Sequence, residues 1–127
     1  MSKVPRPTPA ELEILRVLWQ RGPSTVREVH ATLSENRPTG YTTVLKMLQI
    51  MTEKNLVGRD ESQRAHVYSA RRPESHTQQQ LVRDLLERAF DGSAMKLVMH
   101  ALADRKASPE EIARIRQLLD EIEGGEP

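Results

Sequence analysis

The stretch TGYTTVLKMLQIMTEKNLV, residues 39–57, decides how the rest of this chain is interpreted. Its apolar residues recur at helical spacing and predict a helix with one buried side, formed by Val44, Met47, Leu48 and Met51. At about 100° per residue, the opposite side carries Thr42, Lys46, Gln49 and Glu53. Solvated helix faces usually carry Glu/Lys pairs, and the first residues, Tyr41 to Thr43, are mediocre helix formers. This polar side therefore requires an explanation.

The length and composition of the chain indicate a small intracellular protein. The 127 residues fit one domain, or one domain with an extension, and the absence of cysteine excludes disulfides and thiolate metal sites. No apolar run approaches the roughly 20 residues that span a bilayer, and residues 1–9 lack the apolar segment of a signal peptide. We therefore expect a cytoplasmic protein without membrane insertion. With only four aromatic residues, its core must come from Leu, Val, Ile and Met, which favours helices.

Charge is distributed unevenly along the chain. Residues 1–72 hold 12 Lys and Arg against 7 Asp and Glu, and residues 73–127 hold 7 against 11. A basic first half suggests that this half meets a polyanion. Chance variation in solvated charge is the alternative.

Turn and capping signals divide the chain into elements. Thr8 with Glu11, Thr25 with Glu28 and Ser108 with Glu111 have the spacing of capping boxes and predict three helix starts. Gly22-Pro23 ends the first helix, and the second ends near Asn36. After the quoted helix, residues 56–59 and 66–69 read as two strands of a β-hairpin with a polar tip. Beyond Pro73 the pattern is helical again, with breaks at Asp91-Gly92 and before Ser108.

We predict a mainly α-helical protein with a small β-hairpin and two regions, residues 1–72 and 73–127. Three helices followed by a hairpin is the element order of a winged helix-turn-helix domain. The second region has too few large apolar residues for a core of its own, so we expect it to pair with a second copy; folding back on the first region is the alternative. The residues expected at such a dimer interface are Leu81, Leu85, Phe90, Leu97, Ile112, Ile115, Leu119 and Ile122.

A winged helix places its third helix in the major groove of DNA, which accounts for the polar side of residues 39–57. Threonine offers a hydroxyl and a methyl, lysine reaches guanine or phosphate, and glutamine pairs with adenine. The residues expected to contact DNA are Tyr41, Thr42, Thr43, Lys46 and Gln49 on this helix, Thr25 and Arg37 before it, and Arg59, Arg64 and His66 on the wing. For single residues, roles that do not involve DNA remain open. The threonines could cap the helix, and Lys46 and Arg37 could be ordinary solvated charges. The charges on the wing could serve to block edge-to-edge pairing of strands.

Several segments resemble the penicillinase-repressor family (BlaI/MecI type). They are AELEILRVLW at 10–19, TVREVH at 25–30, YTTVLKMLQ at 41–49, and LVGR with RAHVYSA between 56 and 70, and residues 76–123 are similar to the family's helical dimerisation region. The resemblance implies a homodimeric repressor on an inverted-repeat operator with TACA/TGTA-like cores. It also implies release through cleavage by a membrane-bound sensor protease or a protease that such a sensor activates.

This chain departs from the family's pattern at several places. The segment that is cut at an Asn-Phe bond in staphylococcal members reads LVMHALA here, so the corresponding bond is His100-Ala101. The paired cysteines of the copper-responsive branch are absent. Ile50 stands where many relatives have arginine, and Lys46 where some have threonine.

Two other classes of function fit the sequence less well. No phosphate-binding loop, Gly-x-Ser-x-Gly or His-Glu-x-x-His motif is present, and the four histidines have no metal-ligand spacing, so we expect neither catalysis, nor a cofactor, nor a metal. A winged helix that binds proteins should expose acidic or apolar residues on its third helix, which Thr42, Lys46 and Gln49 do not match. A repressor of another winged-helix family with a different inducer also remains open.

Overall fold

The computed structural model describes residues 5–104 and 106–125 of the chain. The fold divides into two compact units, Met1–Arg83 and Asp84–Pro127, and the division lies inside the helix Glu74–Ala89. Within the described residues, no helix is both long and apolar enough to cross a membrane. Residues 1–4, part of the segment expected to lack a signal peptide, lie outside the description.

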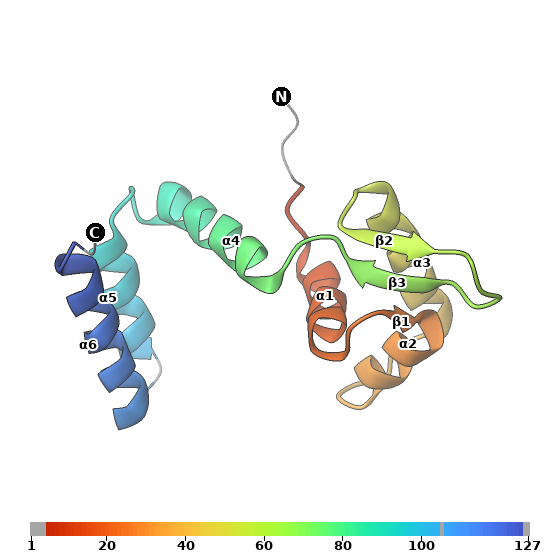
Figure 1. Ribbon diagram of the computed structural model, residues 1–127, viewed down its shortest axis with the longest axis horizontal. Helices are drawn as coiled ribbons and strands as arrows, with labels where there is room; N and C mark the ends of the chain where they lie inside the picture. The colour runs from red at the N-terminus through yellow and green to blue at the C-terminus, as the bar shows by residue number, and fades with distance from the viewer. Residues whose placement is uncertain (1–4, 105, 126–127) are drawn as a thin grey trace. The chain divides into compact units, whose positions relative to one another are not determined.

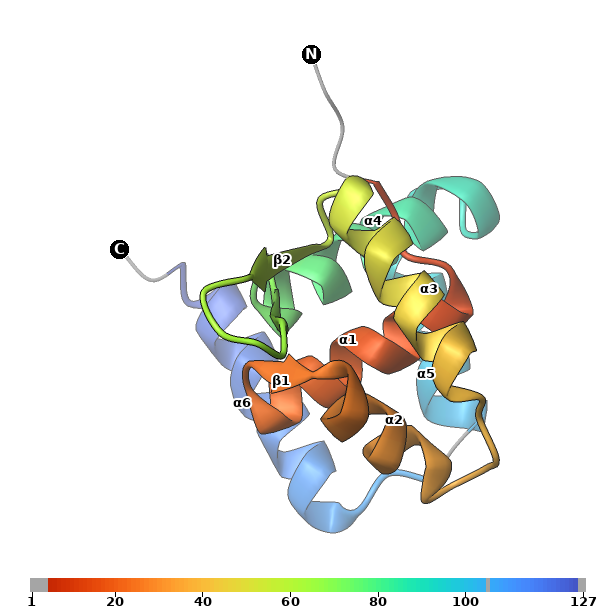
Figure 2. The same ribbon diagram turned by 90° about the vertical axis from the view of Figure 1, so that its right-hand side faces the viewer.

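The first unit contains three helices and a small antiparallel sheet (Figures 1 and 2). The helices are α1 (Pro9–Arg21), α2 (Val26–Ser34) and α3 (Tyr41–Glu53), and the strands are β1 (Ser24–Thr25), β2 (Val57–Asp60) and β3 (Val67–Ala70). The order of elements is therefore that of the predicted winged helix-turn-helix. Both predicted hairpin strands begin one residue later than expected, which leaves His66 in the exposed loop that joins them.

The sheet has three strands, whereas the sequence predicted only two. Strand order is β1-β3-β2, with Ser24 opposite Tyr68 and Val57 opposite Ala70. Thr25 explains the extra strand, because a residue that caps a helix must itself be extended, and its φ and ψ are −81° and 167°. A two-residue strand is too short to leave a periodic signal in a sequence.

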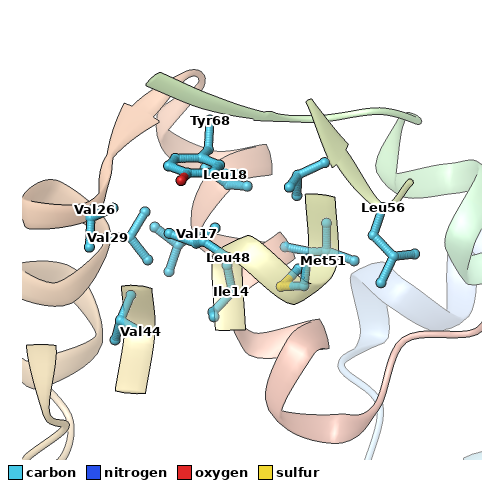
Figure 3. Packing of buried hydrophobic residues seen from close by; sticks show 12 residues of the cluster. Ile14, Val17, Leu18, Val26, Val29, Val44, Leu48, Met51, Leu56 and Tyr68 are labelled. Carbon is cyan, nitrogen blue, oxygen red and sulfur yellow. The ribbon is translucent and has the colours of Figure 1, made fainter. Parts of the chain in front are cut away.

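One side of α3 holds the core of the first unit together. Val44, Leu48 and Met51 on α3 are fully buried, and they meet apolar residues of α1, α2 and the sheet (Figure 3). The residues that surround them include Ile14, Leu15, Leu18, Val29 and Tyr68. Met47, which was expected on the buried stripe, is only partly buried. The predicted amphipathic pattern of α3 is otherwise confirmed.

The second unit contains the end of α4 (Glu74–Ala89) together with α5 (Ala94–Asp104) and α6 (Pro109–Glu123). Ser108 caps α6 by accepting a hydrogen bond of 3.0 Å from the backbone N–H of Glu111. No described residue of α5 or α6 is buried. These helices therefore carry apolar residues that find no core within their own unit.

A buried carboxylate joins the start of α1 to the end of α3. Glu11 is only 5% exposed, and both of its oxygens lie 2.9 Å from the ammonium of Lys54. Burial alone would raise the pKa of Glu11, but the hydrogen bonds from Lys54 and from the backbone N–H of Thr8, with the charge of Lys54, outweigh it and hold this pKa below its ordinary value.

We predict that Glu11→Gln lowers the free energy of unfolding at pH 7 by about 2 kcal/mol, because a hydrogen-bonded buried charge is lost. A carboxyl whose pKa is lower in the folded state stabilises the fold above its unfolded pKa, and this contribution disappears as pH falls through its folded pKa. Urea denaturation from pH 7 to pH 3 should therefore show the two proteins converging in acid.

Glu13→Gln is the matched control, since Glu13 forms an exposed pair with Arg37 and should contribute less than about 1 kcal/mol. A Glu11→Gln protein as stable as the wild type at pH 7 would show that this ion pair does not hold α1 to α3.

Candidate nucleic-acid interface

The outward side of α3 is free of any role in the core. All five residues that the sequence predicted there, Tyr41, Thr42, Thr43, Lys46 and Gln49, are exposed. The helix starts after Gly40, whose cap position has no side-chain hydrogen bond. The idea that Thr42 and Thr43 cap the helix is therefore wrong, since both lie inside its first turn. Their hydroxyls and methyls face outward from a helix whose other side is fixed in the core.

Tyr41 is positioned by a residue that the sequence analysis did not select. The Nε2 atom of His30, on α2, donates a hydrogen bond of 2.7 Å to the backbone carbonyl of Thr39. The rings of His30 and Tyr41 meet edge to face with centroids 5.6 Å apart. His30 thus ties α2 to the turn before α3 and supports Tyr41, which is still 47% exposed. Nothing in the local sequence marks a contact between residues eleven positions apart.

The wing is a hairpin with an exposed, polar tip. Residues 61–66, between β2 and β3, are all exposed, so Arg64 and His66 lie where the sequence predicted. Ser62 donates its backbone N–H to Asp60 Oδ1 at 2.9 Å, and this bond lowers the pKa of Asp60. The tip is therefore shaped by a local turn of the kind that aspartate favours.

Arg59, the other predicted wing residue, already has partners within the protein. Its guanidinium donates to the hydroxyl of buried Tyr68 and pairs with Glu61, and these bonds raise the pKa of Arg59. Glu61 is thus a local counter-ion of Arg59, whereas Arg64 has no pairing carboxylate among the described ion pairs.

The two predicted residues that precede α3 are also engaged. The hydroxyl of Thr25 accepts a hydrogen bond of 3.2 Å from the backbone N–H of Glu28, which confirms the predicted capping box of α2. Arg37 Nη2 lies 2.7 Å from Glu13 Oε1, so Arg37 is paired rather than simply solvated. Both side chains remain at least partly accessible.

In the second unit and on α4, the predicted interface residues are incompletely covered. Leu85 on α4 is exposed, as are Leu119 and Ile122 on α6 at 58% and 67%, and the other five are half-buried. The half-buried five are Leu81, Phe90, Leu97, Ile112 and Ile115. Their incomplete burial leaves apolar surface without a partner.

Two exposed methionines of α5 were missed. Met95 and Met99 are 75% and 53% exposed and share one side of α5 with Val98 and Leu102, which are also exposed. The i, i+3, i+4, i+7 spacing of 95, 98, 99 and 102 was visible in the sequence. The residues at 94, 97 and 101 form a second apolar stripe on the same helix, so the pattern did not single out one side.

The described part of the chain contains no group of three His, Asp or Glu residues that could hold a metal ion. Two hollows on the first unit, one between α1 and α2 and one beside Trp19, are open to solvent rather than enclosed. The exposed side of α3 lies outside both of them.

Comparison with known proteins agrees with this architecture. The family model described as penicillinase repressor matches residues 7–121. A transcriptional regulator BlaI of Mycobacterium tuberculosis (strain CDC 1551 / Oshkosh) is 34% identical over 98% of this chain and 91% of that protein. A penicillinase repressor of Bacillus licheniformis is 28% identical over 95% of this chain and 94% of that protein.

Two solved structures resemble the first unit. One is the solution structure of the DNA-binding domain of the repressor BlaI, with a TM-score of 0.52 and 29% identity. The other is the monomeric form of Bacillus licheniformis BlaI in complex with the blaP half-operator, with a TM-score of 0.50 and 29% identity. Each covers 59% of this chain and 92% of the solved one. The family resemblance and the winged-helix fold predicted from the sequence are confirmed, and the chain belongs to the penicillinase repressor family, whose members are transcriptional repressors and not enzymes.

Proposed function

We propose that this protein is a cytoplasmic transcriptional repressor that binds an inverted-repeat operator, of TACA/TGTA type, as a homodimer. The observation that carries the proposal is the outward side of α3, where five polar or amphipathic residues are exposed while Val44, Leu48 and Met51 are fully buried behind them. Repression follows if the bound dimer blocks polymerase at a promoter.

In this proposal α3 lies in the major groove. A groove about 12 Å wide admits a helix, and its base edges carry the pattern of donors, acceptors and methyl groups that distinguishes base pairs. Lys46 can donate to the O6 and N7 atoms of guanine, and Gln49 can pair with adenine. The threonine methyls suit contact with thymine methyls. Ile50, exposed on the neighbouring part of α3, offers an apolar contact at a position where arginine would offer a phosphate contact.

The flanking residues would fix the position of α3 along the duplex. Arg64 and His66 at the exposed wing tip would contact the neighbouring backbone, as would Thr25, just before α2, and Arg37, in the turn before α3. Arg37 and Arg59 would exchange a carboxylate for a phosphate on binding. The net gain from each is then smaller than for an arginine without a partner, because an existing ion pair is broken.

Dimerisation is proposed to bury the apolar residues of α4, α5 and α6. Exposed Met95 and Met99 would extend the interface beyond the eight residues predicted from the sequence, which already include the exposed Leu119 and Ile122. An apolar surface of this kind on a soluble monomer marks an interaction site. A second copy is the natural occupant, since an operator with twofold symmetry requires a protein with the same symmetry.

Release is proposed to follow cleavage near His100-Ala101 by a membrane sensor protease or by a protease that such a sensor activates. This bond lies within α5, the helix whose described residues are all incompletely buried. Proteases cleave extended chains, so α5 would have to unwind first. In a copy that has dissociated from its partner, a helix without buried anchors unwinds at low cost.

Selection of binding sites from random duplexes tests the proposal. The expected result is a twofold-symmetric sequence with half-sites at one fixed spacing, and binding that weakens steeply with salt because phosphate contacts release counter-ions. Enrichment of no sequence, or binding that salt hardly changes, would favour a protein-docking role for α3 instead.

For the recognition side, we predict that Lys46→Ala reduces binding to the selected operator by about 1–3 kcal/mol and relaxes the preference at one position of each half-site. Electrophoretic mobility shifts on operators substituted at each base pair measure both effects. Lys54 is unsuitable as a control because it pairs with the buried Glu11. The control is Lys96 on α5, and Lys96→Ala should leave the base preference unchanged. An equal loss on every duplex would make Lys46 a phosphate contact only.

For the dimer, we predict that Leu119→Glu combined with Ile122→Glu yields a monomer, because two charges enter an apolar interface. Both positions are largely exposed, so the fold of one copy should survive. The control, Ala113→Glu with Gln117→Glu, adds the same charge to the opposite side of α6. Sedimentation equilibrium should find the first variant monomeric and the control dimeric, and a dimeric first variant would exclude this side of α6 from the interface.

A further inference from the structure

A chain of hydrogen bonds joins the end of α3 to the start of α4, and no local sequence motif predicts it. Arg72 Nη1 donates to the backbone carbonyl of Asn55 at 2.9 Å. The backbone carbonyl of Arg72 itself accepts a hydrogen bond of 2.9 Å from Trp19 Nε1 on α1. We call these three residues the Asn55–Arg72–Trp19 relay. All of its members lie in the first unit.

Asn55 is a rigid end point for this relay. Its φ is +65°, in the left-handed region that asparagine tolerates, and it closes α3 as a Schellman motif. The backbone N–H of Leu56 donates to the carbonyl of Met51 at 2.9 Å, and the N–H of Asn55 donates to that of Thr52 at 3.1 Å. Leu56 is buried, so the turn is anchored in the core. The backbone carbonyl of Asn55 is therefore held in a fixed position relative to α3.

Arg72 is held at both ends, and α4 begins directly after it. Its side chain is fixed to the end of α3 and its carbonyl to α1, and Pro73, whose ring restricts both its own φ and the conformation of Arg72, comes next. Helix α4 starts at Glu74, and Thr77 in its first turns is buried. The first turns of α4, which belong to the first unit, are thus held to α1 and α3 by several independent contacts.

We propose that the Asn55–Arg72–Trp19 relay determines which spacing of operator half-sites the dimer accepts, because it fixes the angle between the recognition helix and the helix that leads to the dimerisation region. This inference rests on the proposed function as a dimeric repressor. Arg72 and Trp19 are positioning residues: they support α4 and need not contact DNA. A protein with a loosened relay would still bind one half-site but would lose its discrimination between spacings.

Arg71 provides a matched control next to Arg72. Its Nε donates to Asn55 Oδ1 at 3.0 Å, so it contacts the same residue but is not held by Trp19. Arg71→Gln removes the same charge as Arg72→Gln and leaves the relay intact. Any general loss of attraction to DNA should therefore appear equally in both variants.

The experiment compares wild type, Arg72→Gln, Trp19→Phe and Arg71→Gln on three kinds of duplex: one half-site, the selected operator, and the operator with one or two base pairs inserted between its half-sites. Each inserted base pair rotates the half-sites relative to each other by about 36°. We expect Arg72→Gln to bind the single half-site like Arg71→Gln, and Trp19→Phe, which keeps every charge, to bind it like wild type. In both relay variants the preference for the selected spacing should fall about fivefold, the worth of one hydrogen bond. Melting temperatures show whether each variant is folded.

Unchanged spacing preference in both relay variants would overturn the inference. So would a loss of half-site binding in Arg72→Gln beyond that of Arg71→Gln, because the relay would then serve only the fold of the DNA-binding unit. If wild type itself preferred no spacing, the proposed function would fail before any variant was compared. The two failures are therefore distinguishable.

Discussion

The burial of one side of α3 is the constraint on which the rest of the structure depends. Val44, Leu48 and Met51 have no exposed surface, and α1, α2 and the sheet pack around them. A helix fixed in this way cannot rotate without exposing the stripe, so its opposite side is held outward whatever residues it carries. This frees Thr42, Thr43, Lys46 and Gln49 from any part in stability. Their poor helix propensity is tolerated because tertiary packing, not propensity, maintains the helix.

In the second unit, unlike in α3, the apolar side chains are not buried within a single copy. Its helices have the amphipathic spacing of packed helices, yet the described residues of α5 and α6 include none that is buried. Apolar side chains such as Met95 and Ile122 contribute to stability only when they leave water. A dimer interface would supply that burial. Local unwinding of α5 would then be easy only in a copy that has left the interface, because α5 has no buried anchors of its own.

The helices of the first unit and the outward side of α3 could be predicted from the sequence, because the patterns that indicate them are local. The apolar period of residues 44–51 identified the buried and outward sides of α3, and Thr25 with Glu28 identified the start of α2. What could not be predicted depends on contacts between distant residues. The hydrogen bond from Trp19 to Arg72 spans 53 positions, and the pairing of Arg37 with Glu13 spans 24. Strand β1 has only two residues, too few to show a periodic pattern in the sequence. Because α5 carries two apolar stripes, the pattern did not single out the side with the exposed methionines.

In the proposed complex, the outward side of α3 of each copy lies against base edges in one of two successive major grooves. Dimethyl sulfate footprinting of the selected operator tests this placement directly, since the reagent methylates guanine N7 in the major groove and adenine N3 in the minor groove. We expect protection of guanine N7 at two symmetric half-sites, centred about one helical turn or a multiple of it apart, with adenine N3 at the same positions still reactive. Guanines that stay reactive in both half-sites while the protein is bound, or protection confined to the minor groove, would contradict it.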